Sequence, residues 1–146
     1  MRVTKNNTGH NKSIFRTRVQ EAGALVAIVL EGRLSVRNVE ALTGRLARLF
    51  TSGKSAIVID FSRLKHADYR CLPSFASSLR RLSLCGCHVT LCSMSDYVFN
   101  IFKAVGCDDG LDIYESKQEA VRALDFYLAG SCASRSSRTR TISATI

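Results

Sequence analysis

The sequence contains no hydrophobic run long enough to cross a membrane. Its longest apolar stretch is residues 24–30, ALVAIVL, and seven residues are far fewer than the roughly 20 that a transmembrane helix needs. The first thirteen residues, MRVTKNNTGHNKS, also lack the apolar segment of a signal peptide. We therefore expect a cytoplasmic protein without membrane insertion, in which the six cysteines are free thiols.

Acidic residues are missing from both ends of the chain. Residues 1–19 and 130–146 hold eight of the nine excess positive charges, so the centre is nearly neutral. This balance argues against a specific nucleic-acid surface. The polar, aperiodic composition of the ends predicts a disordered lead-in over residues 1–12 and a disordered basic Ser/Arg tail over residues 130–146. One domain over residues 13–129 lies between them.

Phosphate-binding loops are absent too. The sequence has no GxGxxG and no GxxxxGK[ST], so neither a dinucleotide nor a nucleoside triphosphate has a recognisable loop. Three cysteines and a histidine lie close together in sequence but lack the spacing of a zinc site. These are Cys85, Cys87, His88 and Cys92. We expect no metal and no cofactor.

One pair of residues leaves a catalytic alternative open. Cys71 stands at a predicted helix N-terminus, which lowers the pKa of a thiol, and His66 precedes it by five residues. The sequence offers no third group to orient this pair and no oxyanion site. We therefore expect the protein not to be an enzyme.

Hydrophobic periodicity predicts five strands and four helices. The first two strands follow each other directly, and after them helices and strands alternate. The predicted strands are residues 14–20, 24–30, 56–60, 88–93 and 111–114. The predicted helices follow Ser35, the irregular segment 62–70, Asp96, and the capping box Ser116–Glu119. Alternation of this kind predicts an α/β fold with a mixed, mostly parallel sheet covered by about four helices.

Several short motifs occur in an order that resembles the STAS domain, the fold of anti-sigma factor antagonists and of sulfate-transporter tails. They are LEGRL at 30–34, IVIDFS at 57–62, Asp68, Gly86 with the strand at 88–91, and the ending Gly106, Ile113 and Ser116–Ala120. The resemblance implies a STAS-like fold that acts as a protein-interaction module in bacterial signalling.

The loop at Asp68 departs from the family pattern. The family reads Asp-Ser-Ser-Gly-Leu, and a cognate kinase phosphorylates its first serine. Here the loop reads Asp68-Tyr69-Arg70-Cys71-Leu72, so Tyr69 occupies the phosphoacceptor position. The chain thus resembles an anti-sigma factor antagonist without the usual phosphoacceptor serine. Two starts stay open for the following helix: just after Asp68, which would put Pro73 past the first turn, or near Pro73, where proline is favoured.

The resemblance also implies which residues meet a protein partner. The predicted partner-binding residues are Asp68, Tyr69, Arg70, Ser74, Ser78 and Arg81, while Asp60 and Ser62 would hold a turn at the end of their strand. A purely structural role stays open for two of these residues. Asp68 would then be a plain helix cap, and Tyr69 a partly buried loop aromatic.

Two kinds of partner fit the resemblance. One is a kinase-like anti-sigma factor. The alternative is an ABC ATPase, with this chain as the small cytosolic STAS subunit of a lipid-transport ABC system. A homodimer also stays open.

Overall fold

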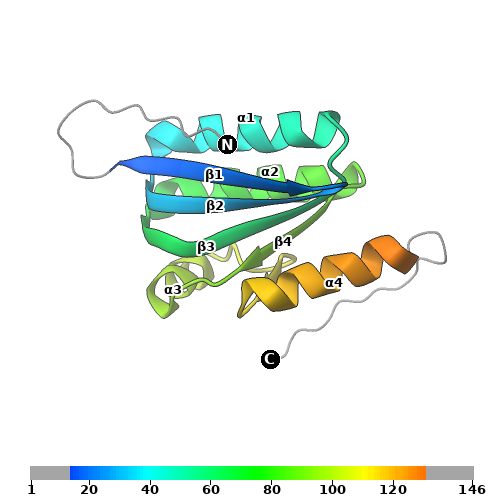
Figure 1. Cartoon of the computed structure of the whole chain (residues 1–146). Helices are drawn as coiled ribbons and strands as arrows, with labels where there is room; N and C mark the ends of the chain where they lie inside the picture. The colour runs from blue at the N-terminus through cyan, green and yellow to red at the C-terminus, as the bar shows by residue number, and fades with distance from the viewer. Residues whose placement is uncertain (1–13, 131–146) are drawn as a thin grey trace.

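The computed structural model describes residues 14–130, which form one five-stranded sheet (Figure 1). The sheet order is β1-β2-β3-β4-β5. β1 is antiparallel to β2, and the other neighbours are parallel. The predicted mixed, mostly parallel sheet is confirmed. The predictions for 1–12 and 130–146 lie outside the described residues, except that Gly130 is the last residue of a helix. The strands are β1 (Phe15–Ala22), β2 (Leu25–Leu34), β3 (Ala56–Ala67), β4 (His88–Cys92) and β5 (Asp112–Tyr114).

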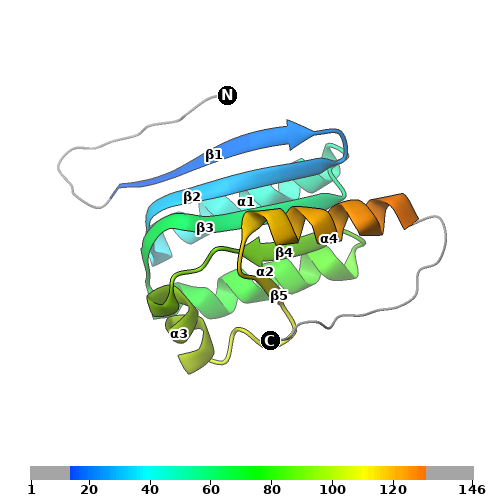
Figure 2. The same cartoon turned by 60° about the horizontal axis from the view of Figure 1, so that its bottom comes forward.

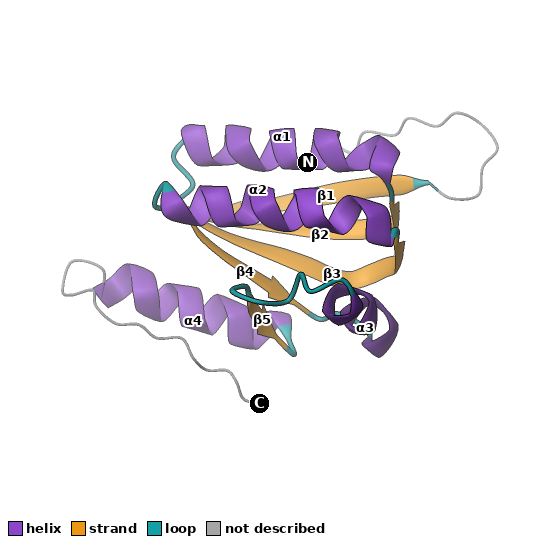
Figure 3. Cartoon of the chain, turned by 180° about the vertical axis from the view of Figure 1, so that it is seen from behind, coloured by secondary structure: helices purple, strands orange, loops and turns teal. Residues whose placement is uncertain are grey.

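Four α-helices cover the sheet, as predicted. Seen from behind, α1 and α2 lie side by side on one face, and α4 crosses the other face (Figure 3). A short 3₁₀ turn, η1, leads into α2. The helical elements are α1 (Val36–Thr51), η1 (Tyr69–Cys71), α2 (Leu72–Leu84), α3 (Asp96–Ala104) and α4 (Lys117–Gly130).

The larger hydrophobic core fills the space between the sheet and helices α1 and α2. Alternate residues of β2 and β3 point into it, and α3 adds Val98 and Phe102. Three phenylalanines meet edge to face at its centre, with ring centroids 5.8 to 6.4 Å apart. They are Phe61, Phe75 and Phe102.

A smaller core lies under α4 on the opposite face. It consists mostly of small side chains, and on β2 and β3 these come from the first residues of each strand. Figure 2 shows that α4 crosses only part of this face, so the start of β1 and the far ends of β2 and β3 have no helix over them. The buried members are Ala27, Ala56, Val58, Cys92, Ala120 and Leu124.

β3 continues seven residues beyond its predicted end at Asp60, so that predicted boundary is wrong. The register shifts by one residue between the pairs Val29–Asp60 and Glu31–Arg63, which marks a β-bulge. Asp60 is 7% exposed, and its Oδ1 accepts a hydrogen bond from the backbone N–H of Ser62 at 2.9 Å. Asp60 and Ser62 therefore stabilise a bulge within the strand, in place of the predicted strand-end turn.

Gly32 makes the close pairing of β1 and β2 possible. Its φ is +96°, and a Cβ at this position would lie 1.8 Å from the carbonyl oxygen of Ile14. Any side chain here would push the start of β1 off the sheet.

Candidate functional site

The loop after β3 lies beside the end of β2. The backbone N–H of Asp68 donates to the carbonyl oxygen of Leu34 at 2.9 Å. This bond joins the two chain segments that lead from β2 into α1 and from β3 into α2. The loop therefore sits at the carboxyl edge of the parallel strands, next to the N-terminus of α1. In open α/β sheets this edge is where binding residues collect.

Asp68 and Arg70 fix the conformation of the loop. Oδ1 of Asp68 accepts from the backbone N–H of Arg70 at 2.9 Å and from its Nε at 3.1 Å, while Oδ2 accepts from Nη2 at 2.8 Å. Asp68 is the N-cap of η1, so the cap reading of this residue is confirmed. These hydrogen bonds, chiefly the one from the Arg70 side chain, lower the pKa of Asp68 to about 2.

Tyr69 projects from this fixed loop into solvent. Its relative exposure is 60%, so the alternative of a partly buried aromatic is wrong. An exposed tyrosine held on an ordered loop loses little conformational freedom when a partner covers it.

α2 continues the site away from the loop. It begins at Leu72 with Pro73 in its first turn, which is the later of the two starts that the sequence leaves open. Ser74 and Arg81 are exposed and Ser78 is half-buried, and spacings of four and three residues put them on one side of the helix. The structure thus brings the six predicted partner-binding residues onto η1 and one side of α2.

The sequence analysis missed a second exposed tyrosine near this loop. Tyr97, in the first turn of α3, is 54% exposed, and its hydroxyl lies 2.7 Å from Nδ1 of His66. The two rings also stack at a tilt, with centroids 5.6 Å apart. No local signal predicts this contact, because it joins residues that lie 31 positions apart.

Cys71 does not have the environment of a nucleophile. Its side chain is buried and its Sγ–H donates to the carbonyl oxygen of Asp68 at 3.1 Å. Burial raises the pKa of Cys71 to about 11, so the predicted lowering is wrong. His66 bonds to Tyr97 instead of the thiol.

The cysteines near β4 do not converge on a common point. Cys87 lies in the larger core and Cys92 in the smaller one, on opposite faces of the sheet. Cys85 is exposed, and His88 contacts the ring of Tyr127 on α4. Within residues 14–130, no three histidine, cysteine or acidic side chains are grouped as metal ligands. No helix in the same range has the length and apolar character to span a bilayer.

Comparisons with known proteins agree with the fold. None of the curated proteins matches the chain. Similar solved structures include SpoIIAA in its unphosphorylated form, an anti-sigma factor antagonist from Mycobacterium paratuberculosis, and a variant of RsbS from Moorella thermoacetica. Their identities to this chain are 20, 16 and 19%, and their TM-scores are 0.63, 0.67 and 0.66.

The matched regions span most of both chains. They cover 75, 76 and 77% of this chain and 96, 94 and 97% of those structures, respectively. The family model described as "Mlab, STAS domain" matches residues 17–115, which is more than half of the sequence. The chain therefore belongs to the STAS domain family.

Proposed function

We propose that this chain is a non-catalytic STAS interaction module that works in the bacterial cytoplasm and binds a protein partner through η1 and the exposed side of α2. The observation that carries the proposal is Tyr69, which is 60% exposed on a loop held by the Asp68–Arg70 pair. Tyrosine and arginine are enriched where protein interfaces are strongest. The loop is ordered before binding, which lowers the entropic cost of association.

Tyr69 also bears on how the interaction is controlled. It stands where the family loop carries the phosphorylated serine, so a serine kinase of that system has no substrate at this position. We infer that partner binding is constitutive, or is controlled at Ser74. Ser74 is exposed in the first turn of α2, where a phosphate would be stabilised by the helix N-terminus.

The same substitution supports a second candidate partner. As the small subunit of a lipid-transport ABC system, the chain would bind an ATPase subunit, and this role needs no phosphorylation switch. Purification of the chain with its partner from the native host distinguishes an ATPase from a kinase-like anti-sigma factor.

The test is the affinity of that purified partner for the wild type and for Tyr69→Ala, measured by calorimetry. We expect Tyr69→Ala to weaken binding by about 1–3 kcal/mol. The matched control is Phe126→Ala, which removes another exposed aromatic, 80% accessible, from α4. Equal binding by all three proteins means that the loop is not the interface.

A further inference from the structure

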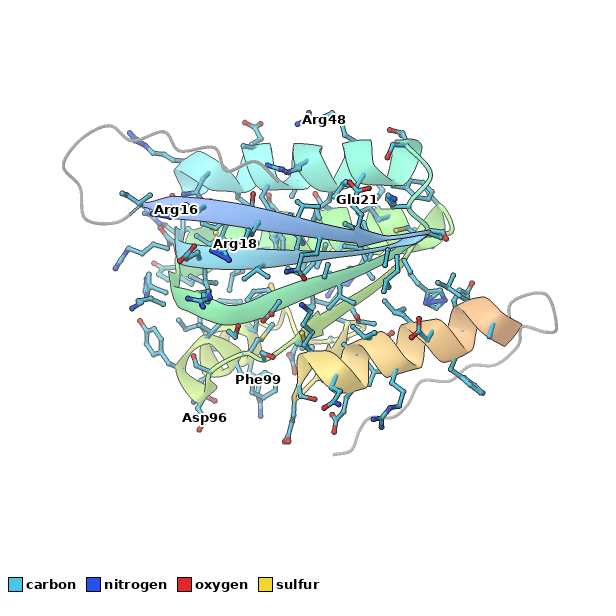
Figure 4. All side chains as sticks on the ribbon, viewed as in Figure 1. Arg16, Arg18, Glu21, Arg48, Asp96 and Phe99 are labelled. Carbon is cyan, nitrogen blue, oxygen red and sulfur yellow. The ribbon has the colours of Figure 1, made fainter. Side chains whose placement is uncertain are left out.

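β1 presents two arginines on the side of the sheet that carries α4. Val19 packs against the larger core on the α1 side, so Arg16 and Arg18 point to the opposite side. The next residue with this orientation, Gln20, accepts a hydrogen bond from Nζ of Lys117 in α4 at 3.1 Å. Figure 4 shows Arg16 and Arg18 in front of the sheet, beyond the reach of α4.

β2 and β3 add two more arginines beside them. Glu31 is in register with Arg16 on one side and with Arg63 on the other. Leu34 is buried in the larger core, so Glu31 and Arg33 face the α4 side. We call this surface the arginine face: Arg16, Arg18, Arg33 and Arg63, with Glu31 among them.

The charge of the arginine face is not balanced within the described chain. All four arginines are exposed. The ion pairs of residues 14–130 join Lys54 to Glu21 and Arg70 to Asp68, so none of the four takes part. The carboxylates on this side of β2 and β3 are Glu31 and the 7% exposed Asp60, which is in register with Val29 and accepts a hydrogen bond from the backbone of Ser62. Four arginines against two carboxylates leave a net positive surface.

This surface belongs to a wider separation of charge. Residues 14–81 hold twelve basic and five acidic residues, whereas residues 82–129 hold three basic and seven acidic ones. Strand order in the sheet follows chain order, so the β1 side is basic and the β5 side is acidic. The basic and acidic halves nearly cancel, so the net charge of the central sequence does not reveal this separation.

We infer that the arginine face docks an acidic surface of a protein partner. Guanidinium groups pair with carboxylates, as with phosphates, through two parallel hydrogen bonds. Among the described residues, no aromatic ring stands beside Arg16 and Arg18 on β1, and only Arg33 has the His66–Tyr97 pair next to it. A run of stacked bases would therefore find rings at one end of the face only. Val29, the apolar strand residue in register with Arg18, is 9% exposed and offers no anchor to a lipid bilayer.

The arginine face is continuous with the loop of the proposed function. Arg33 is in register with His66, which contacts Tyr97, and Asp68 follows His66 by two residues. A protein that covers both Tyr69 and the arginine face therefore has to pass over the carboxyl edge of the sheet at Arg33. This inference adds a second contact surface to the proposed function. It rests on that proposal in one respect, namely that the partner is a protein.

The test uses the full chain and a fluorescent 20-residue poly-L-glutamate peptide, with binding followed by anisotropy at low ionic strength. Arg16→Gln/Arg18→Gln should lower the affinity about fivefold or more. The charge-matched control is Arg37→Gln/Arg48→Gln, two exposed α1 residues on the other side of the sheet, and its affinity should change less than about twofold. Thermal unfolding checks that each variant is folded.

Several results overturn the inference. An equal loss in both double variants means that only the net charge matters, and an undetectable affinity of the wild type means that the face does not bind carboxylates. The same titrations are repeated with a 20-nucleotide oligo-dT and with phosphatidylglycerol vesicles. If either probe binds more tightly than the peptide, and its binding is weakened by Arg16→Gln/Arg18→Gln, the face is a phosphate or lipid site instead. Tyr69→Ala should bind the peptide like the wild type, so failure of the loop interface and failure of the arginine face are separate outcomes.

Discussion

Arg70 folds back onto Asp68 and closes a two-pronged ion pair with it, at 3.1 Å from Nε and 2.8 Å from Nη2. The pair holds the pKa of Asp68 at about 2. Because the folded-state value lies below the ordinary one, its stabilising effect is complete above about pH 4 and is lost as the pH falls toward about 2.

Replacement of Arg70 should release this carboxylate. In Arg70→Ala we expect the pKa of Asp68 to rise toward the usual aspartate range, because the side-chain hydrogen bond is the largest cause of its shift. Carboxyl-carbon NMR during an acid titration measures the value directly. Arg81→Ala, on α2, should leave it at the wild-type value, and an unchanged pKa in Arg70→Ala contradicts the observed pairing.

Gly32 and Gly44 should respond in opposite ways to alanine. Gly32→Ala places a methyl group on the carbonyl of Ile14 at a backbone φ of +96°, and should cost about 2 kcal/mol or more of unfolding free energy. Gly44 lies within α1, where its Cβ would meet only the Arg48 guanidinium at 3.9 Å, so Gly44→Ala should stabilise by about 0.5–1 kcal/mol. Urea denaturation measures both, and equal stability of Gly32→Ala and wild type means that β1 does not approach β2 so closely.

Cys85 should react with iodoacetamide at pH 7.5 well before the buried cysteines. It is exposed at the end of α2, whereas burial raises the pKa of Cys71, Cys87 and Cys92 to about 11. Peptide mapping by mass spectrometry reports the rate at each site, and a parallel reaction in denaturant gives the rate without protection. Alkylation of Cys71 at the rate of Cys85 restores the case for a reactive nucleophile.

The phenylalanine cluster should dominate the stability of the larger core. Phe61 is 1% exposed and contacts both other rings of the cluster, so Phe61→Ala should cost about 3–5 kcal/mol. Phe126→Ala, at an 80% exposed position, should change the unfolding free energy by less than about 0.5 kcal/mol. Chemical denaturation of both variants makes the comparison, and similar losses contradict the assignment of the core.

The sequence predicted the elements whose pattern is local. Apolar stripes located α1 and α2, and of the two starts left open for α2 the structure has the one at Pro73. The mostly parallel arrangement of the strands followed from their alternation with helices. β3 was predicted too short because the bulge at Asp60–Arg63 puts two successive exposed residues, Ser62 and Arg63, in the strand and breaks its alternation.

For the candidate site, local sequence predicted the cap but not the tertiary environment of its residues. Asp68 as a cap follows from local spacing, whereas the burial that raises the Cys71 pKa and the contact of Tyr97 with His66 depend on tertiary packing. The arginine face was hidden for the same reason. Its members come from three strands, and only the register brings Arg16 and Arg63 to either side of Glu31.

The order of the strands has a consequence for synthesis. Each strand pairs with the strand that precedes it in the chain, so no pairing has to wait for a distant segment. As the polypeptide leaves the ribosome, the β1–β2 hairpin can form first, and β3, β4 and β5 can each add to an edge that already exists. The strand order thus lets the nascent chain assemble its sheet in one direction, with α4 as the last element to cover the second face.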